Sequence, residues 1–276
     1  MRWHAQLSAR KHADLQRLVS MLQKTGHKDL VLHLKPEEDN ELTIALRSEP
    51  GRPGGSAEVW CNLVVNQWFD EWDISSMSDD HIYVDLTVEN LAQSLKAADK
   101  ADTISLKLAK KPMPCILIEI KTMMTMIEHT VPVDVRTRVQ MQNDPLVEPM
   151  VEAPEILVWL PQLQKLCTLC ERLSKIDNTV YIAADWATSV LSFRVETDTT
   201  SFTAKYKVKT NAPPDTETEE NEVGVEIKML AKILSCYQVN AKHAVMGIMN
   251  EVILMQITGG ARDELQITFY VPTLVV

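Results

Sequence analysis

The chain has 276 residues and a formal net charge of −10, from 28 Lys and Arg against 38 Asp and Glu. Its 45% hydrophobic and 24% charged residues exclude a disordered chain, and its length is sufficient for two domains. Glycine is scarce, with 8 in the chain, and neither G-x-G-x-x-G nor G-x-x-x-x-G-K occurs, which excludes a glycine-dependent phosphate loop. Taken alone, the acidic total also argues against a nucleic-acid-binding protein.

The cysteines and the apolar segments indicate a reducing compartment. No run approaches 18 consecutive apolar residues, so no membrane span is expected. Residues 1–6 lack the apolar core of a secretory signal. The cysteines are odd in number and scattered, which does not suggest a disulfide framework and favours a cytosolic or nuclear protein. They are Cys61, Cys115, Cys167, Cys170 and Cys236.

The first half of the chain predicts a strand, a helix, several strands, a second helix and further strands. Residues 2–8 alternate weakly, as a strand does, and residues 9–24 place their leucines at helical spacing. A second helix is predicted over residues 87–100, with Thr87 as its N-cap. The other strands of this half are predicted at residues 29–35, 41–47, 57–63, 81–86, 103–109, 115–121 and 126–135.

The second half repeats this order after a break. Residues 136–155 lose all periodicity, contain three prolines and are predicted as a linker. Helices are predicted over residues 160–175 and 227–238, and an acidic, proline-containing loop over residues 211–222. Gly259 and Gly260 are predicted to form the turn of the last hairpin. The strands are predicted at residues 156–160, 179–184, 189–196, 201–208, 243–249, 252–258 and 265–271.

This repeated order predicts the fold class. Helices do not alternate with single strands, so a doubly wound α/β sheet is not expected; an α+β fold with two helices per half, packed on antiparallel sheets, fits better. We expect an N-terminal domain over residues 1–135, an interdomain connector over 136–155 and a C-terminal domain over 156–276. The repeat is one of element order and not of residue identity.

The charge of the predicted helices is opposite to that of the rest of the chain. The four helices carry eleven basic and four acidic residues, a charge of +7, which leaves −17 elsewhere. A solvated face explains basic residues on any one helix. Because all four predicted helices together carry a positive charge, they predict a positive surface that binds the phosphates of nucleic acid independently of its base sequence. The basic residues are Arg10, Lys11, Arg17, Lys24, Lys96, Lys100, Lys165, Arg172, Lys175, Lys228 and Lys232.

No group of residues predicts an enzyme. Cys167 and Cys170 form a lone C-x-x-C on the apolar face of a helix, which favours two small core residues over a redox or metal site. The carboxylate pairs lie in polar loops, and no G-x-S-x-G occurs. We expect the aromatic segment at residues 68–72 to pack over a sheet of this chain. The alternative is that it anchors a partner protein. We expect no catalytic residue, no metal and no cofactor.

Short segments in both halves carry the pattern of a known family. They are residues 59–61 (VWC), 68–72 (WFDEW), 82–91 (IYVDLTVENL), 94–96 (SLK), 104–108 (ISLKL), 114–117 (PCIL), 129–135 (HTVPVDV), 160–163 (LPQL) and 269–272 (FYVP). With the two α+β halves, they resemble the DNA sliding clamps, and among these the HUS-type subunit of the heterotrimeric DNA-damage checkpoint clamp, the nine-one-one complex. The resemblance covers essentially the whole chain and is more specific in the first half.

The resemblance implies a non-enzymatic subunit of a nuclear ring that encircles double-stranded DNA. The helices would line the hole and the sheets would face outward. The implied partners are two other checkpoint-clamp subunits, a clamp loader and repair enzymes, with a role in checkpoint kinase signalling and no membrane contact.

The resemblance also implies where partners would bind. Residues 115–121 would pair with the strand at 201–208 of a neighbour, because unpaired apolar edges need covering. Leu146, Val147 and Met150 in the connector are candidates for partner docking. The residues of the implied subunit edges are Cys115, Leu117, Ile118, Ile120, Phe202, Ala204 and Tyr206.

Three alternatives remain open at this stage. One is a homotrimeric replication processivity clamp built from this chain alone. Another is a partner-binding scaffold whose basic helix faces never contact DNA. The third is a thiol enzyme that uses Cys167 and Cys170.

Overall fold

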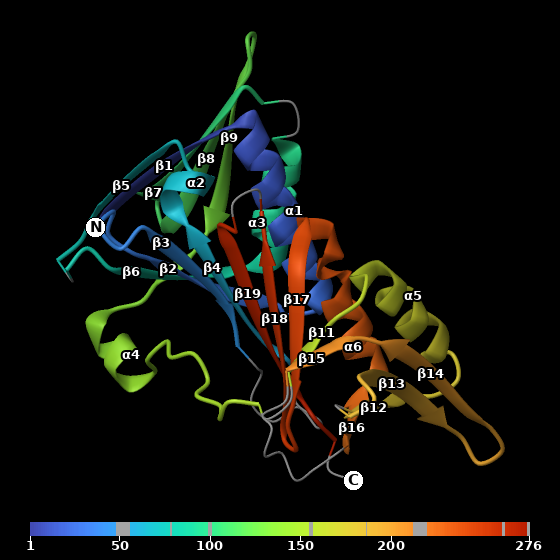
Figure 1. The fold of residues 1–276 in the computed structure, drawn as a ribbon. Coiled ribbons are helices and arrows are strands. Elements are labelled where there is room, and N and C mark those ends of the chain that lie inside the picture. Colours follow the sequence, from blue (N-terminus) through green and yellow to red (C-terminus); the bar gives the residue numbers. More distant parts are fainter. Residues whose placement is uncertain are drawn as a thin grey trace. The chain divides into compact units, whose positions relative to one another are not determined.

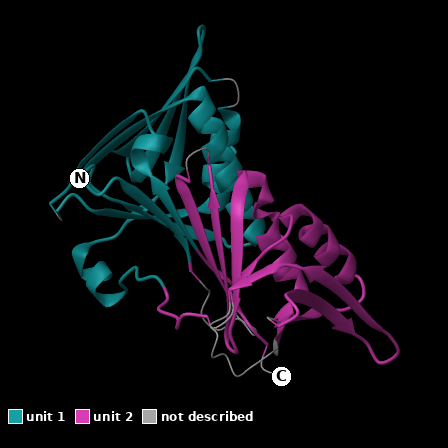
Figure 2. Cartoon of the chain, in the orientation of Figure 1, with its two compact units in different colours: residues 1–46, 60–148 teal, residues 47–59, 149–276 magenta. Residues whose placement is uncertain are grey.

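The computed structural model describes residues 1–47, 56–77, 79–98, 101–154, 157–185, 187–211, 220–260 and 263–274 (Figure 1). The chain forms two compact units, one of residues 1–46 and 60–148 and the other of residues 47–59 and 149–276 (Figure 2). Each combines helices with antiparallel sheets, as the α+β prediction requires. No described helix is long and apolar enough to cross a membrane.

The first unit has two runs of hydrogen-bonded strands, in the orders β5-β1-β7-β8-β9 and β10-β6-β2-β3-β4. Residues alternate in β1, where Trp3, Ala5 and Leu7 are buried, as expected for a sheet with one covered face. The strands are β1 (Arg2–Ser8), β2 (Asp29–Leu34), β3 (Glu41–Leu46), β4 (Glu58–Val64), β5 (Glu71–Ser75), β6 (Ile82–Thr87), β7 (Thr103–Lys110), β8 (Pro114–Lys121), β9 (Met126–Pro132) and β10 (Asp134–Val135).

The helices of the first unit are α1 (Ala9–Thr25), α2 (Val65–Trp68), α3 (Val88–Ala97) and α4 (Arg138–Asn143). Helix α1 matches its prediction and ends at Gly26, whose φ of 90° is a left-handed cap. Helix α4 lies inside the predicted linker. A capping box marks the start of this helix. The Thr137 hydroxyl and the Gln140 side chain each accept a hydrogen bond from the other residue's backbone N–H.

The second unit has a four-stranded sheet, β14-β13-β12-β16, and a run of strands in the order β19-β18-β17-β11-β15. Phe193 and Phe269 are among its fully buried side chains. The last hairpin joins β18 to β19, but Gly259 is still in the ladder, paired with Leu265, and only Gly260, at φ +83°, follows it into the turn; residues 261 and 262 lie outside the described residues. The strands are β11 (Leu157–Trp159), β12 (Thr179–Asp185), β13 (Val190–Glu196), β14 (Ser201–Lys207), β15 (Lys209–Asn211), β16 (Glu220–Glu226), β17 (Ala241–Ile248), β18 (Val252–Gly259) and β19 (Leu265–Pro272).

The helices of this unit are shorter than predicted. Helix α5 (Leu163–Leu173) begins after Pro161, because the Leu160 N–H still belongs to the sheet and donates to the Ala244 carbonyl at 2.9 Å. Helix α6 (Ile227–Leu234) passes into a 3-10 helix, η1 (Ser235–Val239), where a continuous helix is predicted. Most of the predicted loop at 211–222 lies outside the described residues.

Candidate nucleic-acid interface and sheet edges

Helices α1 and α3 pack side by side through a buried histidine. The His12 imidazole is 4% exposed, and its Nε2 lies 2.9 Å from the carbonyl oxygen of Leu95. The other buried residues of α1 are apolar, among them Leu15, Leu18 and Leu22. The apolar side of each helix is therefore taken up by packing, and the opposite sides remain exposed.

The exposed side of this pair carries part of the predicted basic set. Arg10, Lys24 and Lys96 are exposed, and Arg17 is exposed beside Asp14, with its Nη1 3.0 Å from Asp14 Oδ1. An exposed i,i+3 pair of this kind contributes little stability and exchanges easily for another anion. Lys100 lies outside the described residues.

Lys11 is bound within the protein. Its Nζ lies 2.8 Å from the Asp70 carboxylate and donates to the Phe69 carbonyl at 2.8 Å. Burial alone would raise the pKa of Asp70, but hydrogen bonds from Lys11 and the Ser8 N–H, together with the charge of Lys11, lower it below its ordinary value. Lys11 thus anchors α1 to the segment before β5, and we leave it out of the proposed phosphate contacts.

Helices α5 and α6 form the corresponding pair in the second unit. The Cys167 thiol contacts the Ala231 carbonyl at 3.4 Å, and Leu166, Cys170 and Leu230 are buried around it. Burial raises the pKa of Cys170 to about 12. The Cys170 thiol is therefore protonated at neutral pH, and both cysteines of the C-x-x-C are buried, in agreement with the interpretation of this motif as core.

The exposed faces of α5 and α6 are basic. Five predicted cations are exposed, and within the described residues none of them forms an ion pair or a side-chain hydrogen bond. Glu171 is the one acidic residue exposed on these two helices. A cation without an internal partner is free to contact a phosphate. The five residues are Lys165, Arg172, Lys175, Lys228 and Lys232, of which Lys175 follows the end of α5.

The prediction that residues 115–121 form an open subunit edge is wrong. These residues are β8, which pairs with β7 on one side and with β9 on the other. Its predicted edge residues are almost fully buried: Cys115 is 2%, Leu117 5%, Ile118 0% and Ile120 1% exposed. The physical reason is that the four consecutive apolar residues 115–118 are typical of a strand covered on both faces, inside a sheet.

The terminal strands of this sheet are β9, next to β8, and β5 at the opposite end. Strand β9 is the edge that lies beside the predicted one. It is the last strand in the order, and two of its apolar residues are exposed, Met126 by 60% and Ile127 by 43%. Its sequence carried a signal that the prediction did not use, because Glu128 and Pro132 are typical of edge strands.

The second strand predicted to pair with a neighbour, at residues 201–208, lies at the end of its sheet. Strand β14 is the terminal strand of its sheet and pairs with β13. Phe202 is 44% exposed, and Ala204 and Tyr206 are half-buried. Phe202, Ala204 and Tyr206 fall on the same face of the strand.

Contacts hold the connector at both of its ends. Arg136 binds the Asp85 carboxylate with two hydrogen bonds of 2.6 and 2.7 Å, and these bonds raise the pKa of the guanidinium. Its Nη1 also lies 3.4 Å from Asp144. At the far end, a Cβ at Gly247 would lie 2.5 Å from the ring of Pro154, so only glycine lets the connector pass so close to β17.

The docking candidates lie between these two ends. Val147 is 62% and Met150 is 96% exposed, and Leu146 is half-buried. By contrast, the aromatic segment at residues 68–72 packs internally, as favoured from its sequence: Trp72 stands edge-on to Trp3, with ring centroids 5.5 Å apart. Over the part of the chain that the structure describes, no group of His, Cys, Asp and Glu is arranged to hold a metal.

Comparisons with known proteins agree with this geometry. The family model described as Hus1-like protein matches residues 1–275. The chain is 26% identical over 273 residues to "Checkpoint protein HUS1" of Homo sapiens, covering 94% of each chain, and 24% identical to "Checkpoint protein hus1 homolog" of Dictyostelium discoideum, covering 100% of this chain and 99% of the relative.

Solved structures show the fold. PCNA of Thermococcus kodakaraensis superposes with a TM-score of 0.74 at 14% identity, over 99% of this chain and 100% of that chain. PCNA of Entamoeba histolytica superposes with a TM-score of 0.74 at 12% identity, over 99% of this chain and 98% of that chain. The chain therefore belongs to the Hus1-like family of checkpoint-clamp subunits and has the fold of the PCNA sliding clamps.

Proposed function

We propose that this chain is one of three different subunits of a ring that closes around double-stranded DNA and marks damage for the checkpoint. The observation that carries the proposal is the set of exposed, internally unpaired cations on α5 and α6, in a chain whose other residues are strongly acidic. The Hus1-like family is non-enzymatic, and the proposal requires no reaction from this chain.

The cations would act through the phosphate backbone. Each Lys or Arg that approaches a phosphate releases condensed counterions, and the resulting attraction does not depend on base sequence. Contacts of this kind exchange quickly, so the ring could move along the duplex. The proposed contacts are Arg10, Arg17, Lys24, Lys96, Lys165, Arg172, Lys175, Lys228 and Lys232, and Lys100 stays a prediction outside the described residues.

Two of the terminal strands, β9 and β14, would build the ring. Strand β9 would pair with the neighbour on one side and β14 with the neighbour on the other, a head-to-tail arrangement that closes into a ring when the rotation allows. Backbone pairing would satisfy the free N–H and C=O groups of both strands, and the exposed Ile127 and Phe202 would be covered at the same time.

The other partners follow from the same assembly. A clamp loader would open and close the ring, and repair enzymes would bind its outer surface, with Leu146, Val147 and Met150 of the connector as docking candidates. Such a ring acts on chromosomal DNA, so we propose a nuclear location.

The experiment that tests DNA encirclement uses the assembled ring loaded on closed circular DNA. The double variant Lys165→Glu, Arg172→Glu replaces two free cations of α5. We expect it to lower retention on the circle about tenfold or more, because two phosphate contacts become repulsions. The matched control, Lys110→Glu with Arg138→Glu, reverses an exposed Lys and an exposed Arg outside these helices and should leave retention unchanged.

Two outcomes would contradict the proposal. Equal retention of both double variants, with folding and assembly intact, would favour a scaffold that does not contact DNA. A homotrimer is the second candidate, favoured by the presence of both kinds of edge, β9 and β14, in one chain. Light scattering of the purified chain separates the two rings, since a stable species of three times 31.2 kDa would contradict the heterotrimer.

A further inference from the structure

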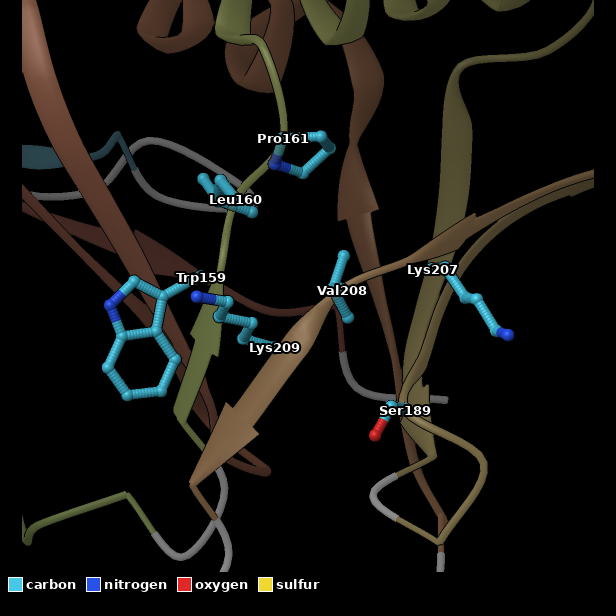
Figure 3. A pocket seen from close by; sticks show the side chains of 7 residues that line it. All are labelled: Trp159, Leu160, Pro161, Ser189, Lys207, Val208 and Lys209. Atoms are coloured by element: carbon cyan, nitrogen blue, oxygen red, sulfur yellow. The ribbon is translucent and has the colours of Figure 1, made fainter.

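A pocket in the second unit lies where the chain passes from one sheet to the other (Figure 3). Its volume is about 430 Å³. One wall is Trp159, the last residue of β11, with Leu160 and Pro161 after it, and the other is the crossing segment from Lys207 to Lys209. None of the basic residues of α5 or α6 lines it, so it is distinct from the proposed DNA contacts.

Backbone hydrogen bonds hold both walls in place. The Val208 N–H donates to the Ser189 carbonyl at 3.0 Å, which pins the crossing segment to the turn between β12 and β13. Ser189 has a φ of 55°, a left-handed conformation that shapes this turn. Across the pocket, Trp159 pairs with Lys209 in the β11–β15 ladder. The pocket is therefore preformed, and a ligand would not have to order its walls.

The lining combines an apolar surface with positive charge. Trp159 is 38% exposed, an unusual exposure for so large an aromatic side chain, and Leu160, Pro161 and Val208 continue its apolar surface. Figure 3 shows Lys209 on the Trp159 side of Val208 and Lys207 on the other side.

Among the described residues, no carboxylate lines the pocket and none forms an ion pair with either lysine. A matching ligand is therefore anionic and also carries a bulky apolar group.

An open strand edge adjoins the pocket. Strand β15 begins at Lys209 and is the terminal strand of its run, paired only with β11 among the described strands. Its free edge offers main-chain donors and acceptors to an extended polypeptide, which can add to a sheet as one more strand.

We infer that this pocket binds an extended acidic segment of a partner protein. One bulky apolar side chain of the segment packs on Trp159 and Pro161, and flanking carboxylates lie beside Lys207 and Lys209. A single-stranded nucleic acid would also offer negative charge and rings that stack on Trp159. The peptide is favoured because the aliphatic Leu160 and Val208 line the pocket and because main-chain groups are open along β15. This assignment does not depend on ring formation.

The test measures fluorescence polarisation of short labelled peptides with the full-length chain. The probe has one Phe between Glu residues. Its matched peptides replace Phe by Ala or Glu by Lys, and a labelled oligothymidine represents single-stranded DNA. We expect saturable binding of the Phe–Glu peptide alone, at dissociation constants below about 1 mM, the weak end of specific recognition.

Variants assign the binding to the pocket. Lys207→Glu should lower the affinity for the Phe–Glu peptide about tenfold, as removal of a close charge pair does. Lys205→Glu should leave this affinity unchanged. Lys205 is an exposed lysine two residues earlier on the same strand and does not line the pocket. Trp159→Phe keeps an aromatic ring in the strand and should lower the affinity for the peptide several-fold.

Several results would overturn the inference. The first is that Lys205→Glu and Lys207→Glu weaken peptide binding equally. The second is that the Phe and Ala peptides bind with equal affinity. The others are that the oligothymidine binds more tightly than the Phe–Glu peptide, or that the peptide shows no saturable binding. Loss of peptide binding when the chain assembles with its partner subunits would also overturn it, because a neighbouring subunit would then be the occupant. A failure of ring assembly would leave these measurements on the single chain unaffected.

Discussion

The ring of His33 lies among other polar rings on one face of the β10-β6-β2-β3-β4 run of strands. It stacks on Tyr83 with centroids 4.0 Å apart and planes 17° from parallel, and its Nε2 is 3.0 Å from Nδ1 of His81. Burial, the charge of Lys35 and the proximity of His81 lower the pKa of His33 from 6.5 to about 3. His33 is therefore neutral in the folded protein at every pH near neutrality.

This lowered pKa predicts how stability depends on pH. Between about pH 6.5 and pH 3 the unfolded chain binds a proton at His33 and the folded chain does not, so acidification favours unfolding. We expect the free energy of unfolding to fall from pH 6.5 to 4.5 more steeply in the wild type than in His33→Asn, by at most about 1.4 kcal/mol per pH unit. Urea titrations at several pH values measure both slopes. Parallel slopes would show that His33 titrates in the folded state as well.

At the scale of elements, strand order decides which strands can bind a neighbour. Strands β8 and β9 are consecutive and both contain apolar residues, yet only β9 is open on one side. The same holds for β14, whose partner β13 is enclosed by β14 and β12. An enclosed strand has no free backbone groups to offer, whatever its composition.

The proposed edges make a prediction about assembly. A glutamate at Ile127 on β9 or at Phe202 on β14 would be buried without a partner in the ring, so each single variant should prevent one of the two subunit contacts while the chain stays folded. Ile176→Glu is the matched control, because Ile176 is 47% exposed, close to the 43% and 44% of the other two, and lies in the turn after α5. Co-purification with the partner subunits measures the effect. Normal assembly of both edge variants would place the interface elsewhere.

At the scale of the whole molecule, the net charge of −10 is the sum of two opposite distributions. The exposed faces of α1, α5 and α6 are basic, α3 exposes one acidic and one basic residue, and most acidic residues lie on the strands and loops. A ring with this distribution would attract a duplex to its helices and repel it from its exterior. The sign of the total charge is therefore a poor guide to nucleic-acid binding in this chain.

The dependence on salt tests this distribution. The affinity of the assembled ring for linear duplex DNA should fall with salt, on a log–log scale, equally for unrelated sequences. Lys228→Gln should reduce the magnitude of the slope by roughly 1, because one phosphate contact is lost. Lys110→Gln changes an exposed lysine of β7 and should leave the slope unaltered. A slope that Lys228→Gln does not change would exclude that lysine from the DNA contact.

The sequence by itself determined what depends on neighbouring positions along the chain. Helical spacing of the leucines identified α1 and the basic face opposite them, alternation identified most strands, and the order of elements predicted the α+β class. The segments that resemble the checkpoint-clamp family led to the correct family, which the comparisons confirmed. These inferences succeed because periodicity and motif spacing are local properties of the chain.

Only the tertiary structure decided what depends on residues far apart in sequence. The place of β8 inside its sheet, the ion pair between Lys11 and Asp70 and the pocket beside Trp159 each join segments that local patterns treat separately. Hydrogen-bonded pairing and ion pairing act through space, and one strand or one lysine has the same local sequence whether its partner is internal or external. Which basic residues have an internal partner, and which strands lie at the end of a sheet, could therefore be assigned only from the folded chain.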